Sequence, residues 1–199
     1  MPTGGTNQPR GDTRPTHPKL LRLIAITILA LIVLVGLAVL ITWLAIKPKR
    51  LLYTIDDGSI NNFNINTDHL NATFGLVIMA HNPNHKISIY YDSIEVSVGV
   101  NGQTVAFNTL EPFYQPRKNM TRLDAKLESR DVALSSSLSR DLRLEKRSGQ
   151  AELDVRIKAR IRYKIGVLKL RHRTLKIECP VIINFSSSKG FERVYCDID

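Results

Sequence analysis

The chain has 199 residues and a formal net charge of +10, and its apolar residues are concentrated near the N-terminus. Once the tail and this apolar segment are set aside, residues 47–199 remain, 153 in number. That length is enough for one domain with its own core, and we expect no second domain.

The N-terminal part predicts a tail followed by one membrane-spanning helix. Residues 1–22 are basic and rich in Pro, Gly, Thr and Asn, so we expect a disordered tail. Residues 23–46 contain no charge and, as a helix, would reach roughly 36 Å, enough to cross a bilayer. The segment is too long for the apolar region of a signal peptide, and it lacks the polar face of a core helix.

The orientation of this helix depends on the sequence that follows it. Four basic residues precede the apolar segment within the tail and three follow it closely, so the positive-inside rule decides little. Three glycosylation sequons, however, all lie after it, at Asn71, Asn119 and Asn184. We therefore expect the N-terminus in the cytosol and the C-terminal domain outside, with all three asparagines as candidate N-glycosylation sites.

The two cysteines, Cys179 and Cys196, lie symmetrically about the segment SSSKG. If VIINF and FERVYCDI form an antiparallel hairpin with its turn there, the two residues face each other at disulfide distance. A disulfide fits an oxidising compartment. The alternative is a pair of small buried residues in a reduced domain.

Residues 47–199 read mainly as strands. Apolar and polar residues alternate with a period of two over 151–165, 121–128 and 94–100, which is typical of half-buried strands. Residues 74–80 are apolar on both faces, as in a central strand, and Asn101-Gly102 predicts a tight hairpin turn. One short helix is expected within 133–149, ended by Gly149. The pattern predicts an antiparallel β-sandwich of immunoglobulin or fibronectin type with one short helix.

No enzyme or metal signature is present in the sequence. Phosphate loops, dinucleotide fingerprints, nucleophile elbows and Cys-x-x-Cys pairs are all missing, so we expect no catalytic residue and no cofactor. His81 and His85 are four residues apart, but Pro83 between them favours a turn over a helical metal site.

The strongest binding signal is charge. Residues 47–199 carry 24 Lys and Arg against 17 Asp and Glu, and nine of these bases lie between Arg156 and Lys176. Five of them share one face of a predicted strand: Arg156, Lys158, Arg160, Arg162 and Lys164. The simplest explanation is a solvated face that keeps a sheet soluble. The functional alternative is a contact surface for anionic lipid or acidic wall polysaccharide, whereas nucleic acid is not expected because exposed aromatic residues are not interleaved.

Several segments together resemble one family. They are WLAIKPKRLLYTI after the apolar segment, then NPNHKISIYYD, EPFYQPRKN, SSLSRDLRLEKRSG and RIRYKIGVLKLRHRTLKIEC, followed by the final Cys. In this order they resemble the plant NHL family of harpin-induced and non-race-specific disease resistance-like membrane proteins, which carry a late-embryogenesis-abundant group 2 domain. The resemblance implies a plasma-membrane protein with an external β-sandwich and roles in defence, stress and contact with the cell wall.

The resemblance supplies no catalytic residues. It does match the NPN segment, Asn82, Pro83 and Asn84, together with Tyr90 and Tyr91, whose physical interpretation is a fixed turn and packed rings. Three functions remain open on the sequence. The first is a membrane-anchored protein whose partner is the cell wall, an anionic surface or another protein. The second is a lipid-handling module with an apolar groove, and the third is a structural stress protein. The oligomeric state and the partner are not specified.

Overall fold

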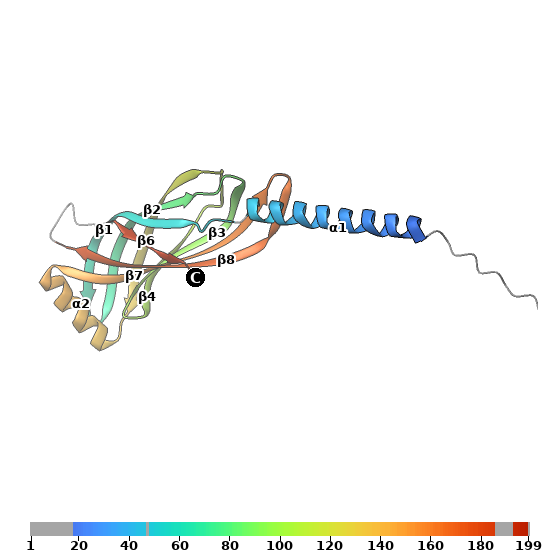
Figure 1. Ribbon diagram of the computed structural model, residues 1–199. Coiled ribbons are helices and arrows are strands. Elements are labelled where there is room, and N and C mark those ends of the chain that lie inside the picture. Colours follow the sequence, from blue (N-terminus) through green and yellow to red (C-terminus); the bar gives the residue numbers. More distant parts are fainter. Residues whose placement is uncertain (1–17, 47, 186–192, 199) are drawn as a thin grey trace, which may run out of the picture. The chain divides into compact units, whose positions relative to one another are not determined.

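The computed structural model describes residues 18–46, 48–185 and 193–198. It divides the chain into two units, an N-terminal helix and a β-domain that begins at Pro48 (Figure 1). Each unit is described by itself below.

Helix α1 (Pro18–Ile46) contains the apolar segment. It begins five residues earlier than predicted, so residues 18–22 of the expected tail are helical. Proline suits the first turn of a helix because its missing N–H has no partner to lose there, and the leucines that follow favour helix. Residues 19–41 are long and apolar enough to cross a membrane. Their exposed apolar surface is typical of a helix that lies in lipid or against a partner.

The β-domain is built from ten strands and one helix among its described residues. They are β1 (Leu52–Asn66), β2 (His69–Asn82), β3 (Ile87–Val100), β4 (Gln103–Leu110), β5 (Phe113–Gln115), β6 (Asn119–Ala133), α2 (Ser136–Ser148), β7 (Gln150–Ile165), β8 (Leu168–Asn184), β9 (Val194–Tyr195) and β10 (Asp197–Ile198).

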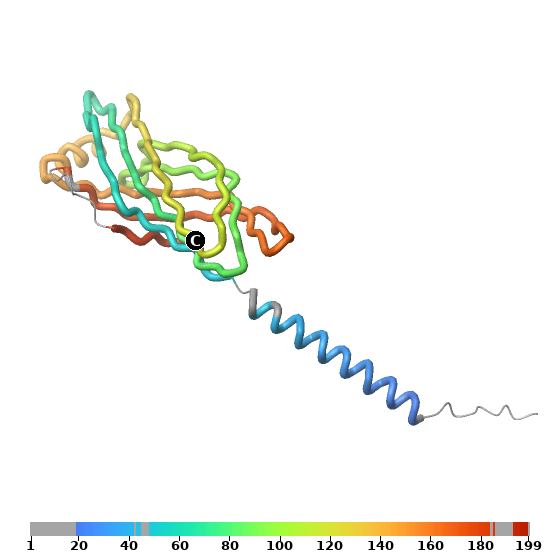
Figure 2. Tube along the Cα trace, turned by 90° about the horizontal axis from the view of Figure 1, so that it is seen from above, coloured from blue at the N-terminus to red at the C-terminus, as the bar shows by residue number. Residues whose placement is uncertain are grey.

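The strands form two antiparallel sheets. The first has the order β6-β2-β1-β9, and the second has the order β10-β8-β7-β3-β4 with β5 added against β3. Buried residues of both sheets form one continuous hydrophobic cluster, so the sheets pack as a sandwich (Figure 2). The predicted fold class is therefore confirmed.

Strand β7 shows why this sequence forms a sandwich. Val155, Ile157, Ala159 and Ile161 are at most 3% exposed, whereas the residues between them point to solvent. In an extended strand, successive side chains point to opposite faces, so the period of two places every apolar residue in the core. The same alternation in β2 places Phe74 in the core from the central region of the other sheet.

The predicted turns and helix also form. Asn101 and Gly102 both have positive φ, 46° and 82°, as a two-residue hairpin turn with a type I′ backbone requires. The side chain of Ser135 accepts a hydrogen bond from the backbone N–H of Leu138 and caps the start of α2. Gly149 ends the helix in the left-handed conformation, with φ 87°.

The C-terminal segment differs from expectation. Residues 181–184 of β8 pair with residues 150–153 of β7, and β9 pairs with β1 in the other sheet. Among the described residues, Val194 and Tyr195 therefore do not pair with VIINF, but the two cysteines do face each other as expected, because β10 and β8 pair in the register that places Cys196 opposite Cys179. Strand β10 pairs with β8 further along the strand, opposite residues 177 and 178. The reason is tertiary, because Val194 and Tyr195 pair instead with Ile55 and Thr54 of β1, in the other sheet.

Candidate functional site

The five predicted basic residues lie together on the outer face of β7. The alternation that buries Val155 and Ile161 turns Arg156, Lys158, Arg160, Arg162 and Lys164 outward. Strand β8 brings Lys176 opposite Lys158, and Lys169 opposite Lys164. This outer surface of β7 and β8 is called the basic face below.

Two of the five bases are neutralised by ion pairs. Arg156 lies 3.6 Å from both Asp154 and Glu178. Arg162 makes a two-pronged contact with Asp92, in which its Nε donates to Oδ2 at 2.8 Å. The hydrogen bond from Arg162 holds the pKa of Asp92 below its usual range, so this carboxylate stays charged near neutral pH. All three ion pairs are partly exposed, so they fix side-chain geometry more than they stabilise the fold.

The other three bases keep their charge available. Among the described residues, Lys158, Arg160 and Lys164 have no carboxylate within 4.0 Å. Neighbouring bases repel one another, and a bound anion relieves that repulsion. The arrangement can therefore hold a multivalent anion without first breaking an ion pair.

Tyr90 lies at one end of the basic face. Its ring is 4.8 Å from the ring of Tyr114, measured between centroids. The cationic groups of Arg162, Lys164 and Lys169 all lie within 6.0 Å of the Tyr90 ring centroid. Cations over an aromatic face are attracted by its quadrupole, so Tyr90 helps to gather three charges in one place.

The NPN segment forms the turn between β2 and β3, and its two asparagines are buried. The side-chain amide of Asn82 donates to the carbonyls of Ile87 and Pro116, at 2.9 and 3.0 Å. The Asn84 side chain accepts from the backbone N–H of Lys49 at 2.7 Å and donates to the Lys49 carbonyl at 3.0 Å. Asn84 therefore pins the start of the β-domain to this turn.

A second buried polar group lies between the sheets. The hydroxyls of Tyr53 and Tyr91 are 2.6 Å apart, and Tyr91 also donates to Gln115. Gln115 in turn donates to the Ala80 carbonyl at 2.7 Å. Burial raises the pKa of both tyrosines, so neither ionises near neutral pH. The sequence matched Tyr91 to a family position but did not single out Tyr53 or Gln115, which became recognisable only when the sheets brought them together.

The three sequon asparagines have different surroundings. Asn71 is exposed on β2, and its side-chain oxygen accepts from the backbone N–H of Asp131 at 2.9 Å. Asn119 is half-buried at the start of β6, where it pairs with Asn82. The side chain of Asn184 lies outside the described residues. Of Asn71 and Asn119, Asn71 is thus the more exposed sequon asparagine.

A disulfide joins Cys179 and Cys196, whose Cα atoms are 4.5 Å apart. Cys179 is buried on β8, and Cys196 lies between β9 of one sheet and β10 of the other. The bond therefore fastens the segment that crosses from sheet to sheet.

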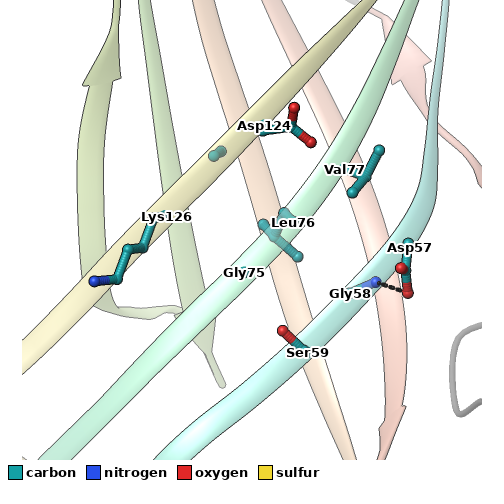
Figure 3. A pocket seen from close by; sticks show the side chains of 9 residues that line it. Asp57, Gly58, Ser59, Gly75, Leu76, Val77, Asp124 and Lys126 are labelled. Atoms are coloured by element: carbon teal, nitrogen blue, oxygen red, sulfur yellow. Dashed lines mark hydrogen bonds between the residues drawn. The ribbon is translucent and has the colours of Figure 1, made fainter. Parts of the chain in front are cut away.

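Two surface hollows of similar size are found among the described residues on the outer face of the first sheet. One, about 240 Å³, is centred on Gly75 and lies between Asp57, Ser59 and Lys126 (Figure 3). A Cβ atom at Gly75 would come within 2.8 Å of the Ser59 hydroxyl, so only glycine fits at this position without a shift. The second hollow is near Met79. Neither lies between the sheets, where a lipid-handling groove would be expected.

The candidate metal ligands of the described residues do not form a metal site. No group of three His, Cys, Asp or Glu residues is placed to hold a metal ion in the part that the structure describes. His81 lies at the end of β2 and His85 in the following turn. The turn that the sequence predicted therefore contains His85 and follows His81.

Comparison with known proteins agrees with this architecture. The family model described as "Late embryogenesis abundant protein" (LEA_2) matches residues 78–179, slightly more than half of the chain. NDR1/HIN1-like protein 10 of Arabidopsis thaliana is 31% identical over 206 residues, covering 96% of this chain and 91% of the relative. The chain belongs to the NDR1/HIN1-like (NHL) family and carries a late-embryogenesis-abundant group 2 domain.

Two other relatives and one solved structure are also similar to this chain. An uncharacterized A. thaliana protein, At1g08160, is 45% identical over 188 residues, which cover 92% of this chain and 84% of the relative. NDR1/HIN1-like protein 3 is 31% identical over 86% of this chain and 78% of the relative. A solution structure of a late embryogenesis abundant (LEA) protein, At2g46140.1, is 18% identical with a TM-score of 0.42, covering 92% of this chain and 100% of that one. The family resemblance predicted from the sequence is confirmed.

Proposed function

We propose that this NHL protein is a non-enzymatic, membrane-anchored protein of the plant stress and defence response. In this proposal α1 spans the plasma membrane, the N-terminus is cytosolic, and the β-domain lies outside the cell. The basic face then contacts an anionic surface, either acidic wall polysaccharide or anionic lipid, and a protein partner with acidic groups would meet the same chemistry. Membership of the NHL family supports the role in stress and defence.

The membrane part of the proposal is supported by α1. Its residues 19–41 form an apolar helix long enough for a bilayer. The outside location of the domain is supported by the sequons that follow the helix and by the Cys179–Cys196 bond, because disulfides persist in oxidising compartments.

One observation carries the binding function. The segment from residue 155 to residue 177 contains nine bases and no acid, and three of its outward bases on β7 have no ion pair among the described residues. The acids beside the basic face pair with Arg156 and Arg162, which leaves the face with a net positive charge at the other three bases. A run of one sign on two neighbouring strands favours an anionic ligand.

The lipid-handling alternative finds less support. It requires an apolar cavity between the two sheets, whereas the buried residues there form one continuous cluster. The two hollows described above lie on the outer surface. We therefore favour surface contact over lipid transport.

Topology is tested by a glycosidase mobility shift on membranes that contain the full chain. Wild type is compared with Asn71→Gln, Asn119→Gln and Asn184→Gln. Stepwise loss of glycan supports an external β-domain. If no site carries glycan and protease added from the cytosolic side digests the domain, the proposed orientation is wrong.

Binding is tested with the full-length protein in phosphatidylcholine nanodiscs and two probes, polygalacturonate and phosphatidylglycerol vesicles. The triple variant Lys158→Gln, Arg160→Gln and Lys164→Gln removes three positive charges from the basic face. The control, which has the same change in net charge, replaces three exposed bases of β6, namely Arg122, Lys126 and Arg130, by Gln. The proposal expects the first variant alone to lose most binding to at least one probe. Equal binding by both variants would refute it.

A further inference from the structure

The turn between β7 and β8 exposes apolar side chains that the core does not use. Val167 is 93% exposed, Leu168 is 66% exposed and Leu170 is 45% exposed. Gly166, with φ 58°, takes the first central position of this two-residue turn, which suits a type II′ backbone. Figure 2 shows the hairpin, in orange, projecting from the β-domain. Residues 164–173 are called the hairpin tip below.

Bases surround these apolar residues. The tip carries Lys164, Lys169, Arg171 and Arg173, and it contains no Asp or Glu. On the side of β8 away from β7, β10 pairs with residues 177 and 178, which lie beyond the tip, and no other described strand pairs there, so this side of the tip is an edge. Charges commonly protect such an edge from pairing with another chain. Edge protection explains the bases, but it does not explain the exposed Val167 and Leu168 beside them.

The tip lies at the end of the domain where the chain enters from α1. Asn84 binds the backbone of Lys49 through two hydrogen bonds. The strand that follows Asn84 begins at Ile87, which pairs with Ile165 at the base of the tip. Lys49 follows the last residue of α1 by only three positions. A helix held in a bilayer would thus tether this end of the domain rather than the end that carries α2.

We infer that the hairpin tip docks into the surface of the membrane in which α1 is anchored. Val167 and Leu168 enter the interfacial region, while Lys169 and Arg171 bind phosphate-bearing lipid headgroups. This inference rests on the proposed membrane anchoring. It assigns phosphate-bearing lipid headgroups as the ligand of the basic face at the end that carries the hairpin tip.

The combination of side chains favours a bilayer over a soluble polyanion. A polysaccharide would satisfy the bases but leave Val167 and Leu168 in water. A bilayer surface accepts both, because apolar side chains gain by leaving water and bases are attracted to anionic headgroups. Aliphatic residues flanked by Lys and Arg are typical of segments that lie in the membrane interface.

The experiment uses a single tryptophan as a depth probe. The chain has one Trp, Trp43 in α1, so Trp43→Phe gives a background without fluorescence from tryptophan. Val167→Trp places the probe at the tip. The matched control is Leu144→Trp, since Leu144 is 56% exposed on α2, just before the opposite end of β7. At about 3.3 Å per residue, the 16 residues of β7 separate the two ends by roughly 50 Å.

Both full-length proteins are reconstituted in nanodiscs that contain brominated lipids, with either phosphatidylglycerol or phosphatidylcholine. The inference expects strong quenching of Trp at position 167 in phosphatidylglycerol and weak quenching at position 144. Replacing Lys169 and Arg171 by Gln should remove most of the quenching at position 167. Stable reconstitution with equally weak quenching at both positions would overturn the docking and leave the anchoring intact. If alkaline carbonate extracted the full-length protein from cell membranes, the proposed anchoring by α1 would itself be wrong.

One further result would reassign the tip. If Trp at position 167 is unquenched in nanodiscs but its emission changes when polygalacturonate is added, the tip binds the polysaccharide, and the bilayer contact is refuted.

Discussion

Removing the Cys179–Cys196 bond should destabilise the β-domain by about 3 kcal/mol. The two cysteines are 17 residues apart, and closing a loop of that size lowers the entropy of the unfolded chain by an amount worth about 3 kcal/mol at 25 °C. The loss should be felt locally as well, because β9 and β10 have only two residues each and cannot stay paired by backbone hydrogen bonds alone. We therefore expect the variant Cys179→Ala, Cys196→Ala to release the C-terminal segment.

The assay is urea unfolding of the full chain in mild detergent, followed by near-ultraviolet circular dichroism of the tyrosines. Tryptophan fluorescence would be a poor reporter because Trp43 lies in α1. With a urea dependence of about 2 kcal/mol/M, a loss of 3 kcal/mol lowers the unfolding midpoint by roughly 1.5 M.

Reductant provides the control. It should lower the midpoint of the wild type to that of the double alanine variant and leave the variant unchanged. The reasoning is refuted if the oxidised wild type and the variant unfold at the same urea concentration, since the bond would then restrict neither the unfolded chain nor the segment that joins the two sheets.

Two further predictions concern the buried polar groups. Asn84→Ala should lower the free energy of unfolding by about 2 kcal/mol, because it removes both side-chain bonds to Lys49 and one of the two hydrogen bonds that the Asn82 side-chain oxygen accepts from residue 84; an unchanged urea midpoint would contradict this. Burial raises the pKa of Tyr53 and Tyr91 above the unfolded value near 10. Their contribution to stability is therefore complete below pH 10. It is lost as the pH rises further, because the unfolded chain releases these protons before the folded chain does. Tyr91→Phe should therefore flatten the alkaline decline by up to about 1.4 kcal/mol per pH unit, measured as the urea midpoint between pH 9 and 11, and an identical slope in both proteins would argue against it.

The strand pattern was predictable from sequence because it depends on a local rule. Alternation in 151–165 fixes which side chains of β7 face the core, whatever the neighbouring strands are. The turn at Asn101-Gly102 and the end of α2 at Gly149 were predictable for the same reason, since positive φ is a property of single residues. Pairing partners are not local, and this is why the sequence did not predict that Val194 and Tyr195 pair with β1 of the other sheet, although it did place Cys179 opposite Cys196.

The candidate site shows the same division. The sequence placed five bases on one strand face, but which of them stay unpaired depends on Asp92 and Glu178, which other strands bring alongside β7. It also counted the bases of the hairpin tip without marking Val167 and Leu168, because exposure of an apolar residue is defined only by what packs over it.

The sequence by itself therefore determined the apolar helix, the β-sandwich and the family, since all three depend on the order and period of residue types along the chain. Tertiary structure alone decided that the C-terminal segment crosses between the sheets and that Tyr53 and Tyr91 pair in the core. It also decided that the first residues of the β-domain and the hairpin tip lie at the same end of the domain. Each of these joins residues far apart in the chain, and a contact of that kind forms only when the packed sheets bring its partners together.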